Sequence, residues 1–261
     1  MIIKDIIKLI EEKAPVSLQE SYDNSGLIFG NPNSDVSKLL ICLDVDTRVM
    51  SYAIEQGCQL VVSHHPAIFS GLKNFSDNSR ETAVLIKAIK NDVALYSSHT
   101  NFDSANGGLT DLLCKRLGVQ KIKVMIQQLS ATEGTGAGRY GDIKAISGEN
   151  FIELVKSSLS IDVIRFVGQI PEIISKVAVY NGSYDRSILE TLGQIGPDAL
   201  ITGDLKYHDA QDLKEKGIFT IDAGHYGTEI IFVEEMTKLI KNRFSDLEVI
   251  QYRGHDVFSY I

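Results

Sequence analysis

The chain has 261 residues, of which 44% are hydrophobic and 23% are charged. These values are typical of a globular protein with one large or two small domains, and they exclude a disordered, collagenous or coiled-coil chain. The formal net charge is -8. A nucleic-acid-binding protein normally carries a basic face, so we do not expect nucleic acid as a partner.

The cysteines and the apolar segments indicate the compartment. Cys42, Cys58 and Cys114 are widely spaced and form no CxxC pair, which is typical of buried thiols in a reducing environment. The apolar N-terminal segment is interrupted by Lys4 and Asp5, so it does not resemble a secretory peptide. The apolar runs fall short of the ~20 residues that span a bilayer. We expect a cytoplasmic protein with no membrane partner.

The first half of the chain alternates between helices and strands. Ile3, Ile6, Ile7 and Ile10 recur at helical spacing and predict an amphipathic helix over the first dozen residues. Asp46 or Thr47 is suited to cap a later helix. In chain order, the pattern then predicts a strand at 38–43, a helix at about 48–56, a strand at 60–63, a helix at about 78–91, a strand at 93–97 and a helix closed by Gly118.

The second half repeats this order. Its predicted elements are a strand at 176–180, a helix within 183–196, a strand at 199–202, a short helix, a strand at 218–222 and a helix from about Thr228 to Lys241. We interpret the repeat as an internal duplication with two lobes, 1–125 and 126–261. Strands that alternate with helices predict an α/β fold with parallel or mixed sheets covered on both faces.

A glycine-rich segment, Gly134 to Gly141, lies between the halves. Gly136, Gly138 and Gly141 formally match GxGxxG. A dinucleotide fingerprint follows a strand and opens a helix, whereas this segment precedes a predicted strand. We therefore expect a glycine-rich loop or hairpin, and we consider contact of Arg139 with an anion as a weaker hypothesis.

Polar clusters follow equivalent strands in both halves, and five of the six histidines lie in them. Ligands in α/β folds bind at the carboxyl ends of strands, so these clusters are candidate functional residues. They comprise His64 and His65 in SHHP, His99 and Asp103 in SHTNFD, His208 in GDLKYHD, and His225 and Glu229 in GHYGTE.

Imidazole and carboxylate ligands point to a transition-metal site. His225 and Glu229 lie four residues apart, which places both side chains on one face of a helix. The combination suits zinc, iron, manganese, cobalt or nickel. The set exceeds the three ligands of a usual catalytic site, and a bridging carboxylate would allow two metals ~3.5–4 Å apart. A hydrogen-bonded polar cluster without metal is the alternative.

Long motifs in these segments resemble the Nif-three-like family of dinuclear-metal hexameric proteins, the GTP cyclohydrolase I type 2 homologues. The resemblance covers nearly the whole chain. It is carried by SYDNSGLIFG (21–30), the SHHP region (43–73), YSSHTNFDSANGGLTDLLCKRLG (96–118), GTGAGRYGD (134–142) and the GDLKYHD and AGHYGTE region (198–229).

The resemblance implies a duplicated, intertwined three-layer α/β/α fold and a toroidal homohexamer, a trimer of dimers. It also implies that two divalent metal ions are bound, with Glu229 as the bridging carboxylate. His99 would be a nearby group that orients a ligand or transfers protons, and Tyr207 and His208 would line the cavity. The implied metal ligands are His64, His65, Asp103, His225 and Glu229.

Two functions of different classes follow. The first is a dinuclear-metal hydrolase that acts on a small molecule such as a nucleotide, with His99 or His208 as the proton shuttle. GTP cyclohydrolase activity enters only through the resemblance, because no residue pattern selects guanine. The second is a metal-binding or regulatory scaffold without turnover. Direct DNA regulation is disfavoured by the acidic charge.

Overall fold

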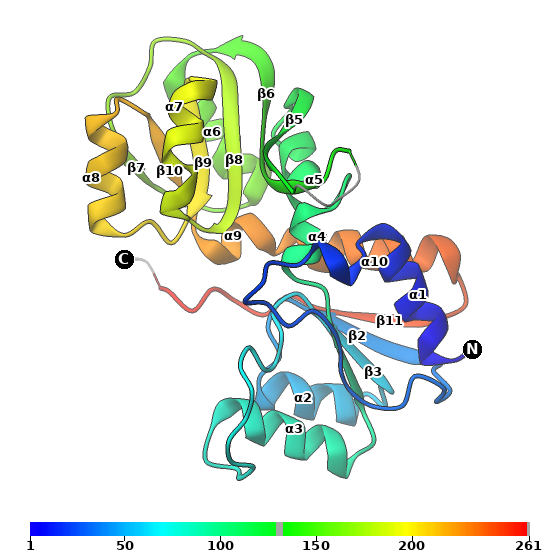
Figure 1. The fold of residues 1–261 in the computed structure, drawn as a ribbon. Coiled ribbons are helices and arrows are strands. Elements are labelled where there is room, and N and C mark those ends of the chain that lie inside the picture. The colour runs from blue at the N-terminus through cyan, green and yellow to red at the C-terminus, as the bar shows by residue number, and fades with distance from the viewer. Residues whose placement is uncertain (129–132, 260–261) are drawn as a thin grey trace. The chain divides into compact units, whose positions relative to one another are not determined.

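The computed structural model describes residues 1–128 and 133–259 and divides the chain into two compact units (Figure 1). The first unit comprises Met1–Phe102 and Ile230–His255. The second comprises Asp103–Glu229 and the chain from Asp256 onward. Each unit contains one mixed β-sheet, of five strands in the first and six in the second.

The sheet of the first unit has the order β1-β4-β3-β2-β11. Its strands are β1 (Gly26–Phe29), β2 (Lys38–Cys42), β3 (Leu60–Ser63), β4 (Ala94–Ser97) and β11 (Glu248–Tyr252). Strand β1 pairs antiparallel with β4, and the other neighbouring pairs are parallel. The unit's helices are α1 (Ile3–Lys13), the short 3₁₀ turn η1 (Val16–Leu18), α2 (Thr47–Glu55), α3 (Arg80–Lys90) and α10 (Ile231–Arg243).

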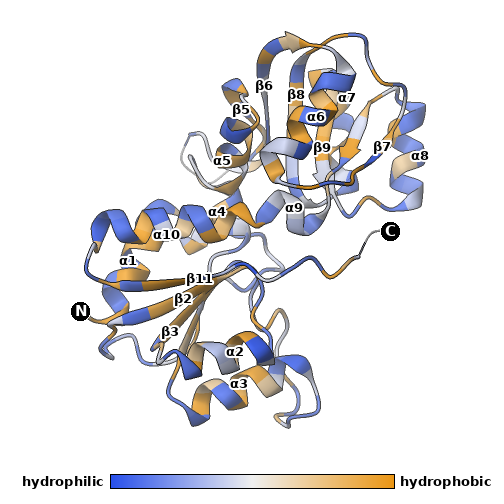
Figure 2. Ribbon diagram, turned by 180° about the vertical axis from the view of Figure 1, so that it is seen from behind, coloured by the Kyte–Doolittle hydropathy of each residue, from blue (hydrophilic) through white to orange (hydrophobic). Residues whose placement is uncertain are grey.

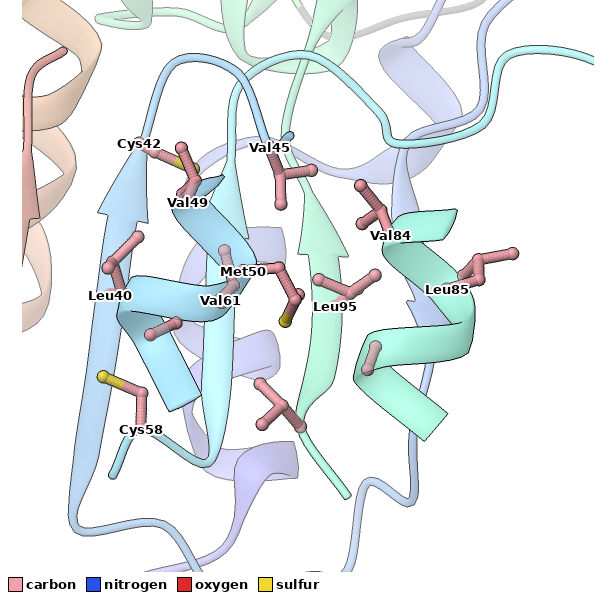
Figure 3. Close-up of a cluster of buried hydrophobic side chains, with 13 residues drawn as sticks. Leu40, Cys42, Val45, Val49, Met50, Cys58, Val61, Val84, Leu85 and Leu95 are labelled. Atoms are coloured by element: carbon pink, nitrogen blue, oxygen red, sulfur yellow. The ribbon is translucent and has the colours of Figure 1, made fainter. Parts of the chain in front are cut away.

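Helices cover both faces of this sheet, with α2 and α3 on one side and α1 and α10 on the other (Figure 1). Leu40, Val61 and Leu95 point toward α2 and α3 and pack with Met50 and Val84 (Figure 3). The alternate strand residues are also buried. This two-sided burial explains why these strands are continuous apolar runs, as the colouring of β2 and β3 in Figure 2 shows.

The sheet of the second unit has the order β5-β6-β8-β9-β10-β7. Its strands are β5 (Gln120–Gln127), β6 (Gly136–Ile146), β7 (Arg165–Val167), β8 (Ile174–Ser183), β9 (Ala199–Gly203) and β10 (Thr220–Asp222). Strands β8, β9 and β10 are parallel, and the remaining pairs are antiparallel. Its helices are α5 (Leu109–Arg116), α6 (Gly148–Leu159), the 3₁₀ turn η2 (Arg186–Ile188), α7 (Leu189–Ile195), α8 (Tyr207–Glu215) and α9 (His225–Glu229).

The short helix α4 (Thr100–Ser104) contains the point at which the chain passes from the first unit to the second. In the second unit, Ala178 and Leu200 pack with Leu192 of α7 and Leu213 of α8. Side chains alternate along strands, so the neighbouring buried residues of β8 and β9 face the opposite side, which α5 and α6 cover (Figures 1 and 2).

These observations confirm the α/β class with mixed sheets. The units divide the chain at other positions than the expected lobes 1–125 and 126–261, because β11 joins the first sheet and α10 packs against β2 and β11. The expected boundary near residue 125 falls inside β5. The helix expected from Thr228 to Lys241 is two helices, α9 and α10, separated at Ile230.

The glycine-rich segment enters strand β6, which forms an antiparallel pair with β5 as the hairpin interpretation predicts. A side chain at Gly136 would place its Cβ 2.1 Å from the carbonyl oxygen of Ile126. Close approach of the strands therefore explains this glycine. Among the described residues, no helix is both long and apolar enough to cross a membrane.

Candidate metal centre

The carboxyl ends of β2, β3 and β4 meet at one edge of the first sheet because these strands are parallel. His64 and His65 follow β3, and His99 follows β4 after Ser98. The backbone continues the ladder past the strands: the amide of His64 donates to the carbonyl of Cys42 (3.1 Å) and the amide of Ser98 to that of Ser63 (3.0 Å). Because the strand hydrogen bonding continues past the ends of the strands, the three imidazoles lie close together.

His64, His65 and His99 form what we call the histidine cluster. The ring centroid of His64 lies 5.1 Å from those of both His65 and His99, and the His65 and His99 centroids are 5.4 Å apart. Each ring offers one nitrogen within 4.8 Å of the other two, a separation at which all three can bind one metal ion. The imidazole of His64 is completely buried.

Each imidazole of the histidine cluster is oriented through Nδ1. The Nδ1 of His64 donates to the carbonyl of Ser98 (2.9 Å), that of His65 to the carboxylate of Asp44 (3.1 Å) and that of His99 to the carboxylate of Asp23 (2.8 Å). Because these oxygens only accept, Nδ1 carries the proton and Nε2 keeps the lone pair. Metal-binding histidines are oriented in the same way in proteins.

Asp23 lies at this edge because β1, which follows it, runs antiparallel to β4. Its side chain has no exposed surface. Burial alone would raise the pKa of the carboxyl group. The hydrogen bond from His99, the positive charge of His99 when its ring is protonated, and the hydrogen bond from Thr100 outweigh burial and hold the pKa well below its usual range. Asp23 is therefore a buried carboxylate that remains ionised.

A second group, which we call the carboxylate cluster, lies in the second unit and contains Asp103, His225 and Glu229. Strands β8, β9 and β10 are parallel, and His225 begins helix α9 just after β10. One helical turn brings Nε2 of His225 within 2.9 Å of Oε2 of Glu229, while Nδ1 donates to the carboxylate of Asp204 (2.8 Å). Glu229 is almost completely buried.

Asn181, near the end of β8, joins the two acidic members of this cluster. Its Nδ2 donates to Oδ1 of Asp103 (2.9 Å) and to Oε1 of Glu229 (3.2 Å). The hydroxyl of Thr110 donates to the other side of the same amide, at 2.6 Å from Oδ1. The amide is thereby oriented, and it fixes the separation of the two carboxylates.

Backbone at Gly182 approaches the carboxylate cluster closely. Gly182 has φ +67°, and an added Cβ would lie 2.1 Å from Oε1 of Glu229 and 3.5 Å from Nε2 of His225. Gly203 is similarly crowded, with an added Cβ 2.5 Å from the carbonyl oxygen of Gly182. A side chain at Gly182 would displace the carboxylate of Glu229, whereas one at Gly203 would meet the backbone of Gly182, Gly224 and His225.

Sequence reasoning found every imidazole of the two clusters but not the groups that orient them. Asp44 and Asp204 follow strands, so the strand-end rule that located the histidines would also have found them. Asn181 and Gly182 lie within a strand, where the sequence gives no such signal. Asp23 is missed because it precedes its strand in a turn-rich segment.

Two further candidates are placed differently. His208 lies in the first turn of α8, is exposed, and contacts Gln211 through Nδ1 (3.0 Å) and the ring of Tyr207. The guanidinium of Arg139 is buried and donates to the Asp111 carboxylate (2.7 Å) and to backbone carbonyls, including that of Gly136. Arg139 thus serves the packing of the second unit, and the anion hypothesis is not needed to explain it.

The donor set fits a divalent transition metal. Imidazole nitrogens with lone pairs and buried carboxylates are ligands that such ions prefer. Buried carboxylates are costly unless a positive charge or hydrogen-bond donors compensate them. Both clusters therefore offer ligands of the kind that a divalent transition metal binds.

Fold and site together define an α/β protein of two mixed sheets with candidate metal ligands at the strand ends. The family model for Duf34/NIF3 (NGG1p interacting factor 3) matches residues 1–256, and the chain belongs to this family. The family expected from the sequence motifs is thereby confirmed.

Relatives match over the full length. A protein from Clostridium perfringens, named GTP cyclohydrolase 1 type 2 homolog, is 36% identical, and the match covers 100% of both chains. The chain is also similar to the crystal structure of Staphylococcus aureus hypothetical protein SA1388, with a TM-score of 0.91, 29% identity and coverage of 100% of this chain and 99% of that one. Reduced HcgD from Methanocaldococcus jannaschii gives a TM-score of 0.84 at 30% identity, covering 96% and 97%.

Proposed function

We propose that the protein is a hydrolase that depends on two divalent metal ions. The proposed ligands are His64, His65, Asp103, His225 and Glu229, with Glu229 as the bridging carboxylate. The observation that carries the proposal is the shared orientation of the imidazoles: His64, His65, His99 and His225 each direct Nδ1 to an oxygen acceptor. A polar cluster without metal does not require this common arrangement.

When bound, the metal ions would lower the pKa of a coordinated water molecule and so supply hydroxide near neutral pH. The chain's own residues then have separate tasks. Asp44 and Asp204 keep the rings of His65 and His225 in place. His99 is left to accept and return a proton through Nε2, and His208 is a second candidate for that role.

The substrate class follows from charge and from the relatives' names. A chain with a net charge of -8 repels anions, so a phosphorylated substrate needs local positive charge, which two divalent ions provide. The curated relatives are named GTP cyclohydrolase 1 type 2 homologs. We therefore propose a small-molecule substrate with nucleotides as the first candidates, and hydrolytic ring opening of GTP with loss of formate is the reaction to test first.

Elemental analysis of protein purified without added metal tests the metal proposal. We expect about two equivalents of metal per chain in the wild type and a marked loss in Glu229→Gln, which keeps the shape of the side chain and removes its charge. Glu235→Gln is the matched control, because Glu235 pairs with Lys238 on α10. No metal, even after reconstitution with zinc, iron or manganese, would refute the proposal.

Turnover separates the hydrolase from the alternative, a metal-binding or regulatory scaffold. The loaded protein is assayed with GTP, bis(p-nitrophenyl) phosphate and dihydrouracil, which represent nucleotides, phosphodiesters and cyclic amides. We expect metal-dependent hydrolysis of at least one, with His99→Gln slow but fully loaded with metal. Slow metal exchange and no hydrolysis of any of them would favour the scaffold.

The resemblance also leads us to propose a toroidal homohexamer in the cytoplasm. Three buried free cysteines, Cys42, Cys58 and Cys114, support a reducing compartment. Burial raises the pKa of the Cys58 thiol to about 11 and that of Cys114 to about 12, which keeps both thiols unreactive. Light scattering after size-exclusion chromatography tests the hexamer, and a mass of one or two chains would contradict it.

A further inference from the structure

Asp23 is surrounded by hydrogen-bond donors on both carboxylate oxygens. Oδ1 accepts from Nδ1 of His99 (2.8 Å) and from the amide of Asn24 (2.7 Å). Oδ2 accepts from the amide (3.1 Å) and the hydroxyl (2.5 Å) of Thr100 and from the hydroxyl of Ser25 (3.0 Å). The side chain has no exposed surface, and that of His99 is 13% exposed. His99 thus reaches solvent while its partner does not.

We infer that Asp23 is a positioning residue that holds His99 in the tautomer with the proton on Nδ1, so that Nε2 is the proton acceptor of the site. The inference deepens the proposed function and rests on it for the reaction. In the proton transfer, an O–H bond of a water molecule or substrate breaks and an N–H bond forms at Nε2. The resulting imidazolium is stabilised by the ionised Asp23, which itself takes up no proton.

The neighbours of Asp23 fix the orientation of its carboxylate, which an ordinary salt bridge does not do. Ser25 and Thr100 bind Oδ2 through one backbone amide and two hydroxyls, so the carboxylate cannot rotate without losing three hydrogen bonds. Oδ1 is therefore fixed toward His99. The Phe69 ring also packs against the imidazole in a T-shaped arrangement, with ring centroids 5.6 Å apart, which restricts the imidazole further.

This geometry predicts what Asp23→Asn does. The amide oxygen keeps the Oδ2 position, where three donors converge, and the NH₂ group takes the Oδ1 position facing His99, where the hydrogen bond from the amide of Asn24 is lost. Nδ1 must then accept a hydrogen bond, so the proton moves to Nε2. The variant would keep the shape of the site and invert the tautomer. A purely structural role for Asp23 predicts no such change at the imidazole.

Solid-state NMR of full-length protein labelled with ¹⁵N at histidine Nε2 measures the tautomer, and the signal lost in His99→Gln identifies His99. In the wild type, both zinc-loaded and chelator-treated, we expect Nε2 of His99 to carry no proton. In chelator-treated Asp23→Asn we expect the same nitrogen to carry a proton. Asp44→Asn is the matched control: it alters the partner of His65 and should leave the His99 signal unchanged. A protonated Nε2 in the wild type would overturn the inference even if Asp23→Asn does not fold.

Enzyme kinetics provide a second readout. The substrate is the one of GTP, bis(p-nitrophenyl) phosphate and dihydrouracil that the protein hydrolyses. General acid–base catalysis contributes about 10²–10⁴-fold, so Asp23→Asn should lower kcat by that order. The double variant Asp23→Asn/His99→Gln should be no slower than His99→Gln alone, because both changes remove the same base. Full additivity would overturn the inference. If the wild type hydrolyses none of the probes, the hydrolase proposal fails and the tautomer alone decides the inference.

Discussion

Gly182 sets how closely the backbone can approach Glu229. An alanine Cβ would lie 2.1 Å from Oε1 of Glu229, and the φ of +67° is one that side chains disfavour. We expect Gly182→Ala to displace Glu229 and to lower metal affinity by at least about tenfold, as changes next to a metal ligand do. Metal titration of the chelated protein, followed by calorimetry, measures the affinity.

Gly196 supplies the control for that experiment. It has a similar φ of +59°, and an added Cβ would meet nothing within 4 Å. Gly196→Ala should therefore cost about 1–2 kcal/mol of stability through its backbone conformation alone and leave metal affinity unchanged. Equal metal affinities in Gly182→Ala and Gly196→Ala would show that contact with Glu229 is unimportant.

Arg139 and Asp111 form a buried ion pair in the second unit, with the guanidinium 1% exposed. Removing one partner leaves a buried charge uncompensated, which costs about 3–5 kcal/mol. We therefore expect Arg139→Met to lower the free energy of unfolding by that amount in urea denaturation. Lys121→Met, which breaks the exposed pair with Asp142, should have no measurable effect, and a similar loss in both variants would contradict the argument.

Residues with distinctive chemistry at strand ends were predictable from the sequence. His64, His65 and His225 each follow a short apolar strand, and the carboxyl ends of parallel strands collect such groups. Asp23 was not predictable, because its position depends on β1 pairing antiparallel with β4 across about 70 residues of chain. The hydrogen bond between Asp23 and His99 is a property of that pairing and has no local signature.

At the scale of one element, Asp46 caps helix α2 and is one of the two residues, with Thr47, that the sequence offers for this role. Its carboxylate accepts from the amides of Arg48 and Val49, both at 2.8 Å. We expect Asp46→Ala to cost about 1 kcal/mol, the usual value of a lost cap, and Asp46→Asn to cost much less. Urea denaturation measures both. Equal losses would mean that charge, rather than the cap hydrogen bonds, stabilises the helix.

Helix and strand positions followed from periodicity where one pattern dominated. Ile3, Ile6 and Ile10 are all buried on one face of α1. The break between α9 and α10 was missed because apolar residues continue through Ile230 without a glycine or proline. Side-chain spacing reports which face is buried, and it carries little information about where one helix ends and the next begins within a continuous apolar run.

At the scale of the whole molecule, the order of elements indicated the α/β class, but the assignment of α10 and β11 did not follow from it. β11 pairs parallel with β2, more than 200 residues earlier in the chain. Local pattern does not specify which of two sheets a late strand joins, because pairing between residues so far apart in the chain leaves no local signature. The first unit is therefore discontinuous in sequence, and a boundary drawn at one position cannot describe it.

Metal binding should stabilise the whole chain if the proposed ligands are correct. A ligand that binds only the folded state, at 1,000 times its dissociation constant, contributes about 4 kcal/mol. For a chain of this size that corresponds to an increase in Tm of about 8–16 °C. We expect zinc to raise the Tm of chelated wild-type protein by that order in scanning calorimetry, to raise it much less in Glu229→Gln, and to raise it fully in the exposed-site control His255→Ala. An equal increase in Glu229→Gln would place the stabilising metal elsewhere, because loss of the proposed bridging carboxylate should weaken the binding of both proposed ions.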